Sequence, residues 1–455
     1  MLRRISAALV SILMLTSASA LAAPVDPPTV NDSLDPGASK TVTKTVHTPA
    51  IAPRPDIMFL ADTTGSMGPA IANVATNAGS IMTTVSGSPG VGEARFGAAE
   101  YKDGEPAFCP SDPFAYRLNQ AVTTNTANVL TGIGMWSASG GCVSESESAL
   151  NALFRIATDA ATMFRPIGTS TRIVAWFGDS DSHDPSFGHS LAQVIAALNA
   201  AQIRVIAVAV VTPAFSNGLD VTGQATAITT QTGGTLLNAA SANDVSTAIL
   251  NGLTNLPVTV THSLSSCDPN LTVTLSPASR TVTSGTDATF TETITVALGG
   301  PQGTTLTCTV NFLLNGQPAT GFTESITIRV NDVTPPTAKC DPTTNPAGNH
   351  IPNAGDNPKS GQNPDGFYVL GATDNVDPNA MIFVADSASS FVAGPYPSGT
   401  TIKLIQAPGA TPNVKPGTGA IDFKITLNGD AIVTAVDASG NVSARATCNV
   451  PPPPK

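Results

Sequence analysis

The chain has 455 residues, of which 41% are hydrophobic and only 12% are charged. Such a length suits about two to four domains, and the apolar content is sufficient to build their cores. The formal net charge of −11 argues against partners such as nucleic acid or an anionic membrane, because both would repel the chain.

The N-terminus has the three parts of a secretory signal. Arg3 and Arg4 give a basic start, an apolar run follows over 7–15, and Ala20-Leu21-Ala22 is a small-x-small cleavage site. The apolar run is too short to span a bilayer, and the sequence suggests no other transmembrane segment. We expect residues 1–22 to be a signal peptide and the protein to be secreted or exposed at the cell surface, with the periplasm as an alternative.

Six cysteines remain after the signal, and an even count in an oxidising compartment predicts disulfides. Other pairings are open on the count alone. One pair per predicted domain gives Cys109–Cys142, Cys267–Cys308 and Cys340–Cys448.

Residues 23–55 form a polar, proline-bearing leader. Within it, 41–46 alternates like an edge strand. We expect this stretch either to pair with the first domain or to remain extended.

Residues 56–256 alternate apolar runs with helical patterns, which predicts a parallel α/β sheet. The runs are apolar throughout, so the strands should be buried on both faces. The predicted strands are 56–61, 95–101, 172–178 and 204–211, and the predicted helices are 70–85, 125–135, 146–157, 191–201, 225–230 and 242–252.

The pattern changes to alternating strands and turns at 257–332, which predicts an immunoglobulin-like β-sandwich. No Trp lies between Cys267 and Cys308, unlike in true immunoglobulin domains. A proline-marked linker, 332–337, leads to a second β-rich domain at 338–450, and residues 451–455 are a proline tail. The predicted fold class is multidomain: a doubly wound α/β domain followed by two β-sandwich-like domains.

One carboxylate and two hydroxyls follow the first predicted strand at alternate positions: Asp62, Thr64 and Ser66. Small oxygen ligands of this kind suit Mg²⁺ or a similar cation. Ligand sites in open α/β sheets lie at the carboxyl ends of the strands. The alternative is a cluster of caps and turns that holds no metal, because these residue types also cap helices.

The stretch 62–66 resembles the Asp-x-Ser/Thr-x-Ser metal-ion-dependent adhesion motif of von Willebrand factor A domains. Further segments resemble the integrin-β-like branch of that family, and the resemblance covers about residues 50–256. These segments are Arg95-Phe96-Gly97 with Tyr101-Lys102-Asp103, Ser139-Gly140-Gly141 with Ser146–Leu153, and Arg172–Phe177 with Gly178-Asp179.

The resemblance implies that Asp62, Thr64, Ser66, Glu147 and Asp179 hold a divalent cation. Mg²⁺ is the first choice, with Mn²⁺ and Ca²⁺ as alternatives. Glu145 competes with Glu147 for the second-loop position. The ion would accept an acidic residue of a protein ligand.

Two departures from the family pattern stand out. Gly68-Pro69-Ala70 replaces the acids of the adjacent metal site, so we expect that site to be absent. The flanking calcium site has lost most of its ligands and retains Asp103.

Other polar groups receive plainer interpretations. His183 lies in an acidic loop, but no nucleophile motif accompanies it, so we interpret it as a loop-ordering residue rather than a catalytic one. The loops 374–379 and 437–441 fit either calcium loops or ordinary Asx turns, and turns are favoured. They resemble loops of bacterial surface immunoglobulin-like repeats.

The sequence therefore predicts a secreted or surface protein that adheres to a ligand through a metal ion and is not an enzyme. The alternative is a non-catalytic scaffold module of an extracytoplasmic assembly, in which any metal has no role in ligand capture.

Overall fold

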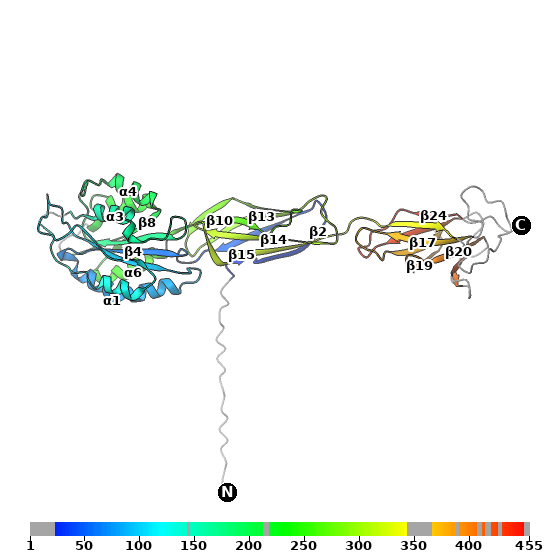
Figure 1. Ribbon diagram of the computed structural model, residues 1–455, viewed down its shortest axis with the longest axis horizontal. Helices are drawn as coiled ribbons and strands as arrows, with labels where there is room; N and C mark the ends of the chain where they lie inside the picture. Colours follow the sequence, from blue (N-terminus) through cyan, green and yellow to red (C-terminus); the bar gives the residue numbers. More distant parts are fainter. Residues whose placement is uncertain are drawn as a thin grey trace, which may run out of the picture.

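The structure is a computed structural model that describes residues 23–142, 146–212, 218–343, 366–387, 391–406, 412–414, 420–425 and 430–449. The predicted signal peptide and proline tail lie outside these residues. The molecule is multidomain, and its described part contains five β-sheets. Figure 1 shows an α/β unit, a β-sandwich and a smaller β unit following one another along the long axis of the molecule.

The α/β unit, which we call the head, is built on a six-stranded sheet of order β6-β5-β4-β7-β8-β9. All neighbouring strands are parallel except the antiparallel pair β5 and β6. The strands are β4 (Pro55–Asp62), β5 (Arg95–Tyr101), β6 (Tyr116–Thr123), β7 (Thr171–Gly178), β8 (Ile203–Val210) and β9 (Thr235–Ala239). Every residue of β4 is buried, as expected for a central parallel strand.

Three helices pack on each face of this sheet (Figure 1). One face carries α1 (Gly68–Gly87), α2 (Thr126–Ile133) and α6 (Val245–Leu253), and the other carries α3 (Ala149–Thr158), α4 (Leu191–Ala200) and α5 (Gln224–Thr232). Side chains cap the starts of two of these helices: Asn125 caps α2, and Ser190 and Gln193 form a capping box at α4. The edge strands β6 and β9, which are only partly buried, were not among the predicted elements.

The predicted leader is not a separate segment. Its strands β1 (Val25–Asp26), β2 (Thr29–Leu34) and β3 (Ser39–His47) belong to the sandwich: β3 pairs with β13, and β2 pairs with β15. The expectation that 41–46 pairs with the first domain or remains extended is therefore corrected. The physical reason is its inward face, since Val46 enters the sandwich core and buried Lys44 pairs with Glu292 and Glu324.

The sandwich contains two facing sheets, of order β1-β3-β13-β11 and β12-β10-β14-β15-β2. Its remaining strands are β10 (Pro257–Ser265), β11 (Leu271–Ser276), β12 (Ser279–Thr283), β13 (Asp287–Val296), β14 (Thr305–Leu314) and β15 (Gln317–Val330). Alternate residues of β13 and β14 are buried, as the strand period of two requires.

The head is an insertion between β3 and β10 of the sandwich. The chain leaves through residue 47 and returns at residue 257, and both crossings flank the turn at 284–286. There the amide of Gly285 donates to the carbonyl of Pro49 at 3.0 Å, and the amide of Ser284 donates to that of Leu256 at 2.9 Å. The head is thus joined to the sandwich by two adjacent connections.

The C-terminal unit also has two sheets, of order β16-β17-β20-β22-β21 and β19-β18-β23-β24. The strands are β16 (Thr337–Pro342), β17 (Phe367–Thr373), β18 (Met381–Asp386), β19 (Val392–Tyr396), β20 (Thr401–Gln406), β21 (Pro412–Val414), β22 (Ile421–Ile425), β23 (Ala431–Val436) and β24 (Ala446–Cys448). An apolar cluster of described residues lies between them.

Each unit contains one disulfide: Cys109–Cys142 in the head, Cys267–Cys308 in the sandwich and Cys340–Cys448 in the C-terminal unit. These are the pairs predicted from the sequence. They fit an oxidising compartment. None of the helices in the described residues has the length and apolar character needed to cross a bilayer.

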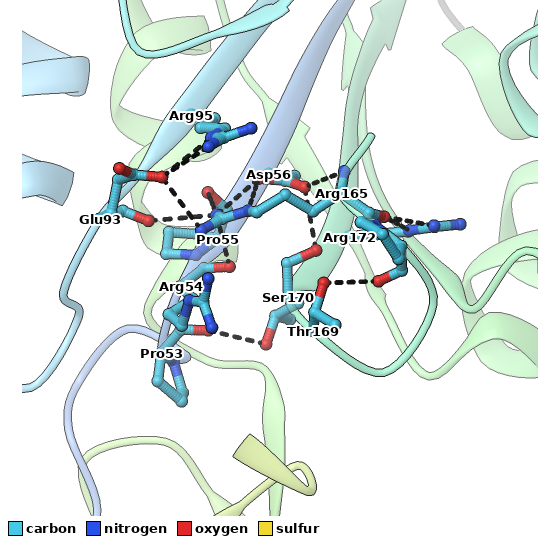
Figure 2. A network of polar contacts seen from close by, with 12 residues as sticks. Pro53, Arg54, Pro55, Asp56, Glu93, Arg95, Arg165, Thr169, Ser170 and Arg172 are labelled. Atoms are coloured by element: carbon cyan, nitrogen blue, oxygen red, sulfur yellow. Dashed lines mark hydrogen bonds and ion pairs between the residues drawn. The ribbon is translucent and has the colours of Figure 1, made fainter. Parts of the chain in front are cut away.

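The amino ends of β4 and β7 are closed by a polar network around Asp56 and Arg165 (Figure 2). The Arg165 guanidinium lies 2.6 Å from Asp56 Oδ1, and the Arg165 amide donates to Asp56 Oδ2 at 2.8 Å. Ser170 Oγ donates to the same Oδ2 at 2.9 Å, and the guanidinium also reaches the carbonyls of Arg54 and Glu93. Both Asp56 oxygens are therefore satisfied at this edge.

Candidate functional site

The carboxyl ends of the same strands form the opposite edge of the head sheet. Asp62 ends β4, and Asp179 directly follows the neighbouring parallel strand β7. The chain runs from β4 to β5 on one side and later returns to β7 on the other. Loops at such a reversal of strand order diverge and leave a crevice, which is where open α/β sheets bind ligands.

Asp62 is fully buried, and its two oxygens have different surroundings. Oδ1 accepts hydrogen bonds from the amide of Thr64 at 2.9 Å and from the Thr64 hydroxyl at 2.7 Å. Oδ2 is also buried but has no hydrogen-bond partner within the described residues. A buried carboxylate oxygen without a donor is costly, so this atom indicates a missing positive partner.

Glu147 is brought to the site by the loop that follows β7. Its amide donates to the carbonyl of Asp181 at 2.9 Å, and its carbonyl accepts from the amide of His183 at 3.0 Å. The Glu147 side chain is 5% exposed, and its Oε2 is buried without a partner in the described part of the chain. Glu145, the competing residue, lies outside the described residues.

The two carboxylate oxygens of Asp179 also have different surroundings. Its Oδ2 accepts from the Thr212 hydroxyl at 2.7 Å, whereas Oδ1 is buried and has no hydrogen-bond partner among the described residues. Burial raises the pKa of Asp179, and the nearby hydroxyls of Thr212 and Ser66 partly oppose that rise. The Ser66 hydroxyl, from the loop after β4, therefore lies near Asp179.

The three carboxylates influence one another electrostatically. Burial, followed by the charge of Asp179, raises the pKa of Asp62 to about 7. Burial, followed by the charge of Asp62, raises the pKa of Glu147 to about 10. Without a cation these groups resist ionisation, because water is excluded and their charges repel.

Lys102 lies near the three carboxylates but donates its hydrogen bonds to backbone carbonyls. Lys102 Nζ donates to the backbone carbonyls of Thr63, Ser137 and Ser139. It therefore orders the loop beside Asp62, and the ion pairs of the described residues do not join it to the three carboxylates.

The second loop depends on two glycines and on Asp112. Gly140 and Gly141 have φ values of +73° and +82°, and a Cβ on Gly140 would lie 1.8 Å from Asp112 Oδ1. The Asp112 carboxylate accepts the Gly141 amide at 3.2 Å, and the Gly140 carbonyl accepts the Gly65 amide at 3.2 Å. The Cys109–Cys142 disulfide holds the same segment. Only glycine suits this backbone and this close approach.

The loop residues around His183 have structural contacts. His183 Nε2 lies 3.0 Å from Asp103 Oδ1, and its ring stacks on Phe108 with centroids 4.0 Å apart. Asp181 accepts from the Ser146 hydroxyl at 3.1 Å. These contacts agree with the interpretation of His183 as a loop-ordering residue.

The site residues predicted from the sequence thus lie at one edge of the head sheet, but their carboxylates are not tightly grouped. Asp62, Glu147 and Asp179 do not offer three oxygens that all lie within 4.8 Å of one another; in the described residues one such group exists, Asp332, Asp374 and Asp437. Gly68, Pro69 and Ala70, which replace the acids of the adjacent site, form the start of α1.

Sequence reasoning missed Thr212, Asp112 and the contribution of Asp332. Thr212 follows a buried strand, as Asp179 does, and that position was the available signal.

Comparisons with known proteins do not identify a family for this chain. No family model and no curated protein matches the chain. Among solved structures, proximal thread matrix protein 1 from the mussel byssus aligns with a TM-score of 0.34 and 16% identity, over 46% of this chain and half of that protein. This similarity is too low to support an argument about fold or function.

Proposed function

We propose that the head is a metal-dependent ligand-binding domain of the von Willebrand factor A type, in its integrin-β-like form. The observation that supports this proposal is the set of orphaned oxygens at the carboxyl edge. Asp62 Oδ2, Glu147 Oε2 and Asp179 Oδ1 are all buried, and none has a hydrogen-bond partner within the described residues. A divalent cation would supply the missing positive charge.

In this proposal Asp62, Thr64, Ser66, Glu147 and Asp179 hold Mg²⁺, with Mn²⁺ or Ca²⁺ as alternatives. Because the carboxylates do not form a tight group, some of them would act through bound water, as is common for Mg²⁺. The hydroxyls of Thr64 and Ser66 are neutral ligands, so the bound ion would keep enough positive charge to accept a carboxylate from a protein ligand.

The rest of the chain fits a protein that presents such a head away from a surface. The sandwich and the C-terminal unit continue from it in line (Figure 1). Each unit contains a disulfide, as in many secreted proteins. The proposed protein is therefore a secreted or surface adhesin without catalytic activity.

Calorimetric titration with Mg²⁺ tests the metal site. Asp62→Asn and Asp179→Asn should abolish the binding heat, because each removes one charge while preserving side-chain shape. Asp184→Asn is the matched control, since Asp184 is exposed in the same loop as Asp179 and uses Oδ1 to accept the Leu191 amide. Identical heats for the wild type and the two site variants would overturn the proposal.

A capture screen tests the ligand chemistry. The protein is incubated, in Mg²⁺ or in EDTA, with immobilised matrix and envelope proteins. Each immobilised protein that binds it is then esterified at its carboxylates, and binding is measured again. Loss of capture both in EDTA and after esterification is expected. Capture that survives both treatments would favour the scaffold alternative.

A further inference from the structure

A second acidic cluster lies where the sandwich meets the C-terminal unit. Asp332 follows β15 on the segment that leaves the sandwich, Asp374 follows β17, and Asp437 follows β23. One carboxylate oxygen of each lies within 4.8 Å of the other two. The three residues are distant in sequence and come from both sides of the joint.

Each aspartate uses one oxygen to shape its own loop. Asp332 Oδ1 accepts the Thr334 amide at 3.1 Å, and Asp374 Oδ1 accepts the amides of Val376 and Asp377, both at 2.8 Å. Asp437 Oδ1 accepts the Asn441 amide at 2.8 Å. The bonds of Asp332 to Thr334 and of Asp374 to Val376 are ordinary Asx turns, which need no metal, and the bond of Asp437 closes a slightly longer loop. They account for only one oxygen of each carboxylate.

The second oxygens of Asp332 and Asp374 are not explained by turns. Asp332 is only 8% exposed, and its Oδ2 is buried without a hydrogen-bond partner in the described residues. Asp374 Oδ2 is orphaned in the same way. Two unpartnered carboxylate oxygens next to a third acid would be unstable without a cation.

No protein cation fills this position in the part of the chain that the structure describes. Arg329 and Asp332 line one cavity, but Arg329 is exposed and forms no ion pair with the three aspartates in the described residues. Asn441 Nδ2 donates to Asp437 Oδ2 at 2.9 Å and to the Asp332 carbonyl at 3.0 Å, which leaves the negative charge intact. Burial, followed by the charges of Asp374, Asp437 and Asp377, raises the pKa of Asp332.

We propose that Asp332, Asp374 and Asp437 form a calcium site that locks the joint between the sandwich and the C-terminal unit. Three acidic oxygens from three separate loops suit Ca²⁺, which takes six to eight oxygen ligands in variable geometry, better than Mg²⁺, which demands a near-ideal octahedron. The ion would leave the cluster with one negative charge instead of three.

The same place already contains direct contacts between the two units. Val376 packs so closely on Gly303 of the sandwich that a Cβ there would lie 2.4 Å from Val376 Cγ1. Asn441 reaches back to the Asp332 carbonyl. A calcium ion would therefore fix a joint whose surfaces fit but whose charges repel. This inference does not depend on the function proposed for the head.

The test uses the full chain with the head site removed by Asp62→Ala, so that calcium heats report the joint. Calorimetric titration with Ca²⁺ should show one site in Asp62→Ala. Adding Asp332→Asn should weaken it at least about 100-fold. Adding Asp341→Asn, a control at an exposed acid on β16, should leave it unchanged. Circular dichroism checks that the variants fold.

Small-angle X-ray scattering of the same proteins tests the locking. In Asp62→Ala, Ca²⁺ should narrow the distribution of interatomic distances at the long end, and EDTA should broaden it; the protein that also carries Asp332→Asn should not respond. Absence of a calcium heat in Asp62→Ala, or equal heats after adding Asp332→Asn and after adding Asp341→Asn, would overturn the site. A normal heat with unchanged scattering would overturn the locking role.

Discussion

Two aspartates on one strand of the head show opposite treatments of a buried charge. Asp56 is the second residue of β4, Asp62 ends the strand, and both are fully buried. At the amino edge, Arg165, Ser170 and a backbone amide satisfy both Asp56 oxygens. At the carboxyl edge, Asp62 retains an oxygen with no partner in the described residues, and two further acids lie nearby.

In our proposal, the difference separates a structural ion pair from a site that binds a cation. Removing one member of a satisfied buried pair is strongly destabilising, because it leaves the other charge buried without a partner. An unsatisfied carboxylate already destabilises the fold, and that cost is offset when a cation binds. The two edges should therefore respond in opposite directions to loss of charge.

The largest effect is expected at the amino edge. Arg165→Met leaves the Asp56 carboxylate buried without its counter-charge, so the free energy of unfolding of the head should fall by about 3–5 kcal/mol. Urea denaturation followed by Trp fluorescence measures the head selectively, because both tryptophans of the chain, Trp136 and Trp176, lie in it. Arg95→Met is the control: its guanidinium meets the half-exposed Glu93, so less than about 1 kcal/mol should be lost. Equal losses would contradict the comparison.

The carboxyl edge should make the metal-free head sensitive to pH. The folded pKa values of Asp62 and Glu147, about 7 and about 10, lie above their ordinary values of 3.8 and 4.5. Between those limits the folded state binds protons that the unfolded state has released. The free energy of unfolding in EDTA should therefore fall as pH rises from about 4 through 7 and towards 10.

Urea titrations at several pH values, again followed by Trp fluorescence, check that slope. Saturating Mg²⁺ should reduce it, because metal and protons compete for the same oxygens. Combining Asp62→Asn with Glu147→Gln should flatten it in EDTA. A slope that is unchanged in the double variant would place the titrating groups elsewhere.

A smaller effect of opposite sign is expected for Asp62→Asn alone. The amide oxygen can still accept the bonds from Thr64, while the unpaired charge disappears. At pH 8 in EDTA the free energy of unfolding should rise by about 1–3 kcal/mol. Mg²⁺ should stabilise the wild type and not the variant in the same assay. Destabilisation by Asp62→Asn would show that this edge is structural, as the amino edge is.

The smallest effect is expected from Thr212→Val. This change removes the 2.7 Å hydroxyl bond that orients Asp179, so Mg²⁺ affinity by calorimetry should fall about tenfold. Thr162→Val, which removes an equally short, partly buried bond from the buried Thr162 to the Asp159 carbonyl, should leave affinity unchanged. Similar affinities for the two variants would argue against a role of Thr212 at the site.

The sequence predicts the central strands and the six helices of the head because their burial patterns are local and strong. The edge strand β6 and the leader strands are harder to predict. Half-exposed strands have similar sequence patterns whether they lie at the edge of a sheet or within a sandwich. The pairing of β3 with β13 places Ser39 opposite Thr295, and the sequence of the whole head lies between these two residues. No local pattern encodes such a partnership, so the insertion of the head could not be predicted from the sequence.

The same limit applies to the sites. Asp62 and Asp179 were predictable because they end neighbouring apolar strands, and parallel strand ends share one edge of a sheet. Asp112 and Thr212 act through loops whose position depends on tertiary packing. Asp332 stands near two prolines in a segment that reads as a linker, and only the folded joint brings it to Asp374 and Asp437.

The insertion of the head has a mechanical consequence. A tensile load applied to the head enters the sandwich through β3 and β10 together, and these strands belong to different sheets. It leaves through the single segment after β15. Pulling the head out of the sandwich would therefore have to rupture the hydrogen-bond ladders of both sheets.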